Sequence, residues 1–215
     1  MRQPLTEGLV SLISLLRQME QEVDRMLQDA IRSLKDLDRE GAEQCILADP
    51  KVNGLETQVN EACVRLIVTQ QPVASDIRKI VSAMKISTDL ERMADLAVDV
   101  AKVVKRIEGP LMKPLIDIPR MADLTVRMIH RGLEAYEKED AALAAELAVM
   151  DDEVDHLYNA VIKDLITLMA ADLSMTTQGM YLSFVARYIE RIADHATNIG
   201  EHVIYIVSGE RKDLN

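Results

Sequence analysis

The chain of 215 residues contains no tryptophan, and aromatic residues make up only 3% of it. Glycine and proline are also scarce, at 8 and 6 residues, whereas methionine reaches 12 and apolar residues 48%. Strands are enriched in aromatic and β-branched residues, so this composition argues against a β-sandwich. It favours helices that pack through aliphatic and methionine side chains.

Basic residues are fewer than acidic residues. The sequence has 25 lysine and arginine residues against 36 aspartate and glutamate residues, which gives a formal net charge of −11. A strongly acidic protein repels phosphate backbones, so we expect no nucleic-acid partner. Acidic surfaces instead attract metal cations or basic surfaces of other proteins.

Targeting segments and metal-binding cysteine motifs are missing as well. The amino-terminal residues lack the basic-then-apolar pattern of a signal peptide, and the apolar run at 9–16 is too short for a membrane span. Cys45 and Cys63 have no metal-like spacing, so we expect buried thiols in a reducing cytosol. We therefore predict a cytoplasmic protein without direct membrane insertion.

Helical periodicity fills the stretches between the few glycines and prolines. It predicts a first helix over about residues 5–37. A short helix is expected after Gly41, followed by a break at Asp49-Pro50 and another helix that ends at Gln70.

The next helix is predicted to include Pro72 in its first turn, because proline lacks only an N–H that would be unpaired there. It extends to about Ile107, where Gly109-Pro110 ends it. No segment shows the alternating pattern of a strand.

The chain is a tandem duplication. Shifting the sequence by 102 positions lays residues 19–55 on residues 121–157 without gaps. The matched pairs include Met19 with Met121, Asp38 with Asp140, Ala42 with Ala144, Asp49 with Asp151, Val52 with Val154 and Leu55 with Leu157. Because three amphipathic helices can enclose one core, we predict an all-α fold of two three-helix bundles in tandem. The first repeat is predicted over 1–108, the linker over 109–116 and the second repeat over 117–215.

A short acidic motif occurs once in each repeat, 99 residues apart: Glu-Arg-Met-Ala-Asp at 91–95 and Glu-Arg-Ile-Ala-Asp at 190–194. At about 100° per residue, residues four apart lie on one face of a helix, so the acidic side chains form rows. The first row is Glu91, Asp95 and Asp99, and the second is Glu190, Asp194, Asn198 and Glu201. We expect both rows to lie roughly opposite the apolar seams that face the core.

A solvated helix face is the simplest interpretation of such a row. Two observations favour metal binding instead. Carboxylates four residues apart repel each other, and no lysine lies four residues after Glu91, Asp95 or Glu190. The arrangement also recurs in the second repeat, and several carboxylate oxygens at short range suit a hard cation.

The sequence resembles the PhoU family of bacterial phosphate-uptake regulators over nearly its whole length. The resemblance lies in the duplicated helical pattern, in Gln-Gln-Pro-Val-Ala-Ser-Asp-Ile-Arg at 70–78, and in the motifs at 89–95 and 190–201. It implies a cytoplasmic, all-helical homodimer that binds the ATPase subunit of the phosphate ABC transporter and a sensor histidine kinase. It would thereby keep phosphate-starvation genes off in rich medium.

The resemblance also implies metal ions at the acidic motifs, in some relatives multinuclear iron clusters. The motif positions are Glu91, Asp95, Glu190 and Asp194, with Asp99, Asn198 and Glu201 as extensions. Candidate ions are Fe, Mn, Mg, Zn and Ca. Because Asn198 stands where the first repeat has Asp99, and Glu201 where it has Lys102, equal affinities are not expected.

Two other functions remain open. A di-iron enzyme or metal-storage bundle needs two Glu-x-x-His motifs that point inward, and this chain has only Glu153-Val-Asp-His156. A helical adaptor without metal is the other alternative. We expect no enzymatic activity, because no nucleophile is paired with a base and no glycine-rich phosphate loop is present. His195 and His202 lie near the acidic face, where they serve either as surface residues or as nitrogen ligands.

Overall fold

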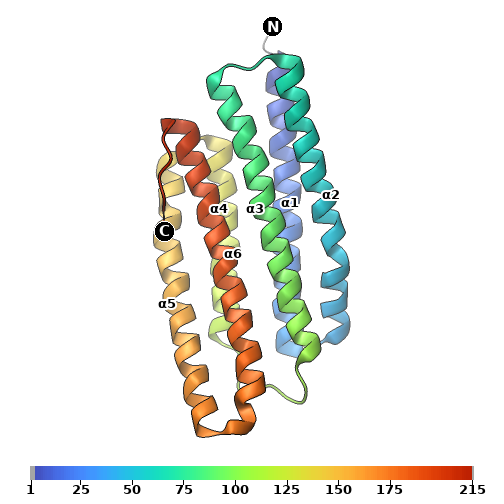
Figure 1. The fold of residues 1–215 in the computed structure, drawn as a ribbon, viewed down its shortest axis with the longest axis vertical. Coiled ribbons are helices and arrows are strands. Elements are labelled where there is room, and N and C mark those ends of the chain that lie inside the picture. Colours follow the sequence, from blue (N-terminus) through green and yellow to red (C-terminus); the bar gives the residue numbers. More distant parts are fainter. Residues whose placement is uncertain (1–2, 215) are drawn as a thin grey trace.

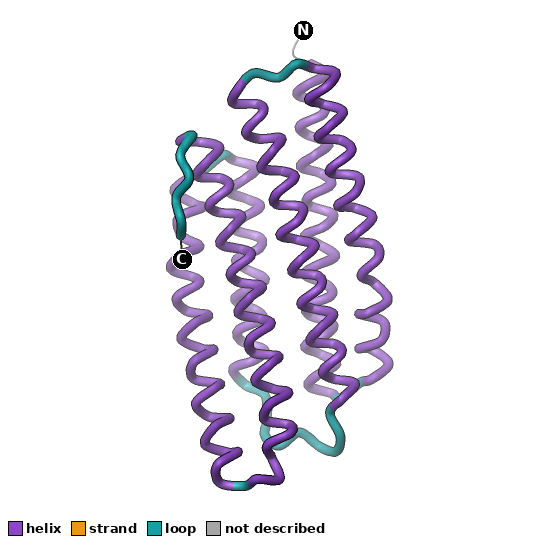
Figure 2. Tube along the Cα trace, in the orientation of Figure 1, coloured by secondary structure: helices purple, strands orange, loops and turns teal. Residues whose placement is uncertain are grey.

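The computed structural model describes residues 3–214 and consists of long helices that run along one common axis (Figures 1 and 2). The helices are α1 (Gln3–Asp36), α2 (Arg39–Gln70), α3 (Ala74–Arg106), α4 (Asp117–Lys138), α5 (Ala141–Ala171) and α6 (Thr176–Ser208). A 3₁₀ turn, η1 (Leu173–Met175), precedes α6. Within the described residues there is no strand, and the predicted all-α fold of two three-helix repeats is confirmed.

Matching residues begin the second helix of each repeat. Asp38 precedes α2, and its carboxylate accepts hydrogen bonds from the backbone N–H groups of Glu40 and Gly41, both at 3.0 Å. Asp140 precedes α5 and accepts in the same way, from Ala142 and Leu143 at 2.9 and 3.0 Å. Capping aspartates satisfy N–H groups that the first helical turn leaves unpaired, which explains why these two aligned positions keep one residue type.

The predicted break at Asp49-Pro50 is wrong, because α2 continues through Pro50. Proline removes one backbone hydrogen bond inside a helix, but Pro50 is exposed, so water can solvate the freed carbonyl group. Cys45 and Val52 are buried on either side of it. Packing of both parts of α2 against the core outweighs the local preference for a break.

The start of α3 also differs from the prediction. Pro72 lies outside the helix, which begins at Ala74. Gln71 ends α2 in the left-handed conformation (φ 46°), and Val73 is extended (ψ 172°). The chain therefore needs Pro72 and Val73 to reverse direction before a helix can begin.

One continuous apolar core joins the two repeats. In each repeat the three helices contact one another, and α3 also packs along α6 at the centre of the molecule (Figure 1). Met93 of α3 and Ile192 of α6 are fully buried there. Because α3 has neighbours in α1, α2 and α6, little of its surface is left to solvent.

Cys45 and Cys63 are buried free thiols, as predicted. Burial raises the pKa of each thiol to about 12, so both stay protonated. Cys45 donates to the carbonyl of Met26 at 3.3 Å. Among the described helices, none is long and apolar enough to cross a membrane.

Candidate functional site

The first acidic row lies on α3 at its border with α2. The side chain of Glu91 is only 16% exposed, and those of Asp95 and Asp99 are 44% and 39% exposed. The sequence predicted a row roughly opposite the apolar seams that face the core, and for Glu91 this is wrong. A helix with neighbours on several sides has no fully solvated face on which to place its charges.

Helix α2 brings further carboxylates to this row. Burial raises the pKa of Glu91, and the negative charges of Asp95, Glu56 and Asp49 raise it further. Asp49 accepts a hydrogen bond from Asn53 at 3.0 Å through one oxygen. Its other oxygen, Oδ1, is buried and has no hydrogen-bond partner among the described residues. We call Asp49, Glu91 and Asp95 the first carboxylate cluster.

The second repeat also brings acids of two helices together. Glu190 and Asp194 of α6 lie across from Asp151 and Asp155 of α5, and we call these four residues the second carboxylate cluster. Burial raises the pKa of Asp151 to about 7, with the charges of Asp194, Asp155 and Glu190 adding to the effect. Burial likewise raises the pKa values of Glu190 and Asp194.

Glu190 is 9% exposed, although acids of this kind are rarely so deeply buried without a partner. One of its oxygens accepts from the guanidinium group of Arg187. The other, Oε2, is buried and unpaired within residues 3–214. A buried carboxylate oxygen without a donor is costly unless a proton or a cation compensates it.

Sequence reasoning missed Asp49, Asp151 and Asp155 as site residues. A signal was present, because Asp49 and Asp151 are aligned in the repeat and kept as aspartate. The aligned aspartates served only as evidence of duplication. Placing them in the carboxylate clusters requires knowing which face of the second helix of each repeat lies against the third helix.

The remaining predicted positions are engaged elsewhere. Asp99 forms an ion pair with Lys102 at 2.9 Å. The amide of Asn198 donates to Asp89 Oδ1 at 3.1 Å, and Glu201 accepts a hydrogen bond from the backbone N–H of Leu214 at 3.0 Å. The structure thus brings together the core motif of each repeat and places its predicted extensions in other contacts.

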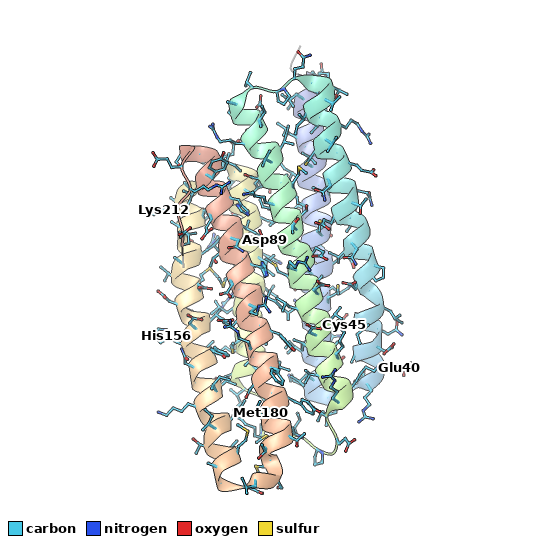
Figure 3. All side chains as sticks on the ribbon, in the orientation of Figure 1. Glu40, Cys45, Asp89, His156, Met180 and Lys212 are labelled. Carbon is cyan, nitrogen blue, oxygen red and sulfur yellow. The ribbon has the colours of Figure 1, made fainter. Side chains whose placement is uncertain are left out.

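A polar network ties α3 to α6 between the two repeats. Asp89, labelled in Figure 3, accepts from His195 Nδ1 at 2.9 Å, from Asn198 at 3.1 Å and from His202 Nε2 at 3.2 Å. Burial alone would raise the pKa of Asp89, but the hydrogen bonds from His195, His202 and Asn198 hold it below its usual value. These histidines bridge the repeats. Arg92 forms an ion pair with Asp95, three residues further along α3, at 3.0 Å.

The donor set of both clusters fits a hard cation, since all the groups are carboxylates. Each cluster also contains one buried oxygen, of Asp49 or of Glu190, that has no hydrogen-bond partner among the described residues. Among residues 3–214, however, no three or more His, Cys, Asp or Glu side chains are arranged so that they could hold a metal ion directly.

The arrangement does not match a di-iron bundle. Glu153 and His156 are both exposed on the outer face of α5, and the His156 ring nitrogen lies 2.5 Å from the carbonyl oxygen of Asp152 (Figure 3). Such a bundle needs this motif to point inward from two helices.

Comparison with known proteins gives consistent matches along the chain. The family model described as PhoU domain matches twice, at residues 16–104 and 118–203. The chain is 35% identical to the phosphate-specific transport system accessory protein PhoU homolog of Clostridium acetobutylicum, over 100% of this chain and 99% of the relative. It is 34% identical to the homolog of Pseudomonas aeruginosa, over 87% of this chain and 78% of that protein.

Solved structures agree with this result. The crystal structure of PhoU from Pseudomonas aeruginosa superimposes with a TM-score of 0.89 at 33% identity, covering 95% of this chain and 99% of that one. The phosphate transport system regulatory protein PhoU from Streptococcus pneumoniae gives a TM-score of 0.88 at 29% identity, covering 95% and 97%.

Proposed function

The chain belongs to the PhoU family, and from that premise we propose that it is an accessory regulator of phosphate-specific transport. The observation that carries the proposal is the match of both repeats to the PhoU domain, together with an accessory protein matched over almost its full length. A shared domain alone would say little about activity, because one fold can serve many functions. Here the whole architecture is shared.

We further propose that it acts through protein contacts in the cytoplasm and not as an enzyme. Its partners would be the ATPase subunit of the phosphate ABC transporter and a sensor histidine kinase, and the active form would be a homodimer. Long helices with short connections offer broad contact faces. Exposed apolar side chains on these faces and connections, such as Val68 (71% exposed), Ile116 (72%) and Leu173 (82%), support contacts of this kind.

The two carboxylate clusters are the proposed metal sites. Asp49, Glu91 and Asp95 would hold a cation between α2 and α3, and the second cluster would hold one between α5 and α6. A bound Fe, Mn, Mg, Zn or Ca ion would supply the positive charge that these acids lack and would cross-link the two helices. The second cluster has more carboxylates and the strongly raised pKa of Asp151, so we expect tighter binding there.

The function can be tested in a strain whose own PhoU-family gene is deleted and replaced by this one. Phosphate-repressible alkaline phosphatase is then measured in phosphate-rich medium. The wild-type chain should keep the phosphatase off. Phosphatase that stays on, with normal levels of folded protein in a host whose transporter and kinase match, would refute the regulator assignment.

The same strain tests the metal sites. The variant Glu91→Ala/Asp95→Ala/Glu190→Ala/Asp194→Ala should lose repression. The exposed pair Asp152→Ala/Glu153→Ala, next to the second cluster, serves as the control and should keep it. In parallel, Mn²⁺ should raise the melting temperature of wild type and of the control but not of the fourfold variant. If the fourfold variant still represses and still responds to Mn²⁺, the clusters are ordinary half-buried acids.

A further inference from the structure

The outer face of α2 has no neighbouring helix. Within residues 3–214 this helix packs only on α1 and α3, and it forms one edge of the molecule (Figure 1). On its exposed side, Val64 is 53% exposed and Val68 is 71% exposed. Solvated helix faces usually carry polar residues, and β-branched residues slightly disfavour helices. Two exposed valines one turn apart therefore indicate a contact surface.

Two opposite charges lie beside these valines. Glu61 and Arg65 are exposed and one turn apart, a spacing at which a glutamate and an arginine of the same helix can pair. In the part of the chain that the structure describes, however, neither side chain is in an ion pair. A shallow surface hollow of about 550 Å³ covers this face, and its lining comes from α2 alone: Asn60, Glu61, Val64, Arg65, Val68 and Thr69. Both charges are thus available to another molecule.

The spacing of these residues makes the face complementary to itself. In two antiparallel copies of α2 related by a two-fold axis midway between Glu61 and Arg65, each glutamate lies level with the arginine of the other copy. A two-fold interface contains every such contact twice, so two ion pairs form. With a rise of 1.5 Å per residue, the two Val64 side chains are offset by only about 3 Å along the helices and meet near the axis.

The second repeat lacks this self-complementarity. At the positions that correspond through the shift of 102 residues, α5 has Lys163, Ile166, Thr167 and Ala170. Ile166 is 57% exposed, so the apolar position is kept. The pair of opposite charges is not kept, because a lysine and an uncharged threonine occupy its positions. Only the first repeat therefore combines exposed apolar residues with charges that can pair across a two-fold axis.

We propose that the outer face of α2, formed by Glu61, Val64, Arg65 and Val68, is the surface through which two copies of this chain pair in antiparallel orientation. The pairing rests on the homodimer that is part of the proposed function, and it gives that homodimer a contact face. Charge identifies the occupant as a second copy. The same face of another molecule brings an arginine to each glutamate, a glutamate to each arginine, and apolar side chains to the valines.

Sedimentation velocity of the full-length chain at about 1–100 µM tests this surface. Val64→Asp/Val68→Asp should weaken self-association by at least about 100-fold, because it places like charges in an interface that excludes water. Ile166→Asp on α5 makes the same kind of change at a position of similar exposure and should leave self-association unchanged.

The outcomes separate this surface from the rest of the proposed function. A wild-type chain that stays monomeric over the whole range would overturn the pairing, while phosphatase repression tests the regulator independently. A dimer that survives the valine variant, or that Ile166→Asp weakens equally, would leave the homodimer standing and refute the α2 surface.

Charge reversal tests the antiparallel register and does not depend on the valine variant. Glu61→Arg and Arg65→Glu each place like charges opposite one another on both sides of the axis, so each alone should weaken self-association about 10-fold. An equimolar mixture of the two variants should associate as tightly as wild type, because every facing pair then has opposite charges. Recovery on mixing also shows that both variants are folded. A mixture that associates no more tightly than the single variants would refute the register.

Discussion

Replacing Asp151 by asparagine should stabilise the metal-free protein. In the folded chain this carboxyl keeps its proton up to about pH 7, whereas in the unfolded chain it loses it near 3.8. The folded state therefore binds more protons between these pH values, and the free energy of unfolding falls as the pH rises through that window. An asparagine side chain cannot ionise, so the variant escapes this loss.

The size of the effect follows from the pKa. A rise from 3.8 to about 7 corresponds to an upper bound of about 4 kcal/mol. Asp151 is only partly buried, and solvent screening reduces this figure to about 1–2 kcal/mol. For a chain of this size the melting temperature should rise by about 2–8 °C at pH 8, and by little at pH 4.

Thermal melts of EDTA-treated protein at pH 4, 6 and 8 measure this effect. Asp152→Asn makes the same change of charge at an exposed neighbouring position and is the matched control. A gain from Asp151→Asn that is no larger than the control's at pH 8, or that is the same at every pH, would refute burial of the charge as the cause. The same variant should also weaken the stabilisation by Mn²⁺ proposed for the second cluster.

Three further changes probe the fold by thermal melts. Asp89→Asn replaces one acceptor oxygen of the network with His195 by a donor, and should lower the free energy of unfolding by about 1–3 kcal/mol. Because the pKa of Asp89 is lowered in the folded chain, wild type should lose this stabilisation as the pH falls below 3.8. An equal difference between wild type and variant at pH 3 and pH 7 would contradict this. Pro50→Ala should stabilise by about 1–2 kcal/mol by restoring a helical hydrogen bond, and a loss of stability would show that the proline is required. Leu16→Ala, at a fully buried site, should cost about 2–5 kcal/mol, whereas Leu47→Ala, 62% exposed, should change stability by under about 0.5 kcal/mol.

Local chemistry accounts for several features without any knowledge of packing. Asp38 and Asp140, which the sequence analysis used only as an aligned pair, precede helices because a short acid satisfies unpaired N–H groups where a helix begins. The spacing of Glu91 and Asp95 places them one above the other on any α-helix. These properties depend on neighbours within a few residues, so reading the sequence is enough to find them.

The errors arose where distant contacts outweigh local preference. Pro50 predicts a break, yet buried residues on both sides keep α2 continuous. The acidic rows were expected roughly opposite the apolar seams. In the structure α3 lies against α1, α2 and α6. The side chain of Glu91 is therefore mostly buried, at the border between α3 and α2.

The sequence by itself determined the helices, the duplication and the acid pairs one turn apart, since all three follow from periodicity along the chain. Only the tertiary structure decided which other carboxylates meet those pairs. Asp151 and Asp155 lie near Glu190 because α5 packs on α6 in one register. Asn198 and Glu201 lie outside this cluster and form hydrogen bonds with Asp89 and Leu214. The register of packed helices depends on the shapes of many side chains at once, and no short stretch of sequence contains it.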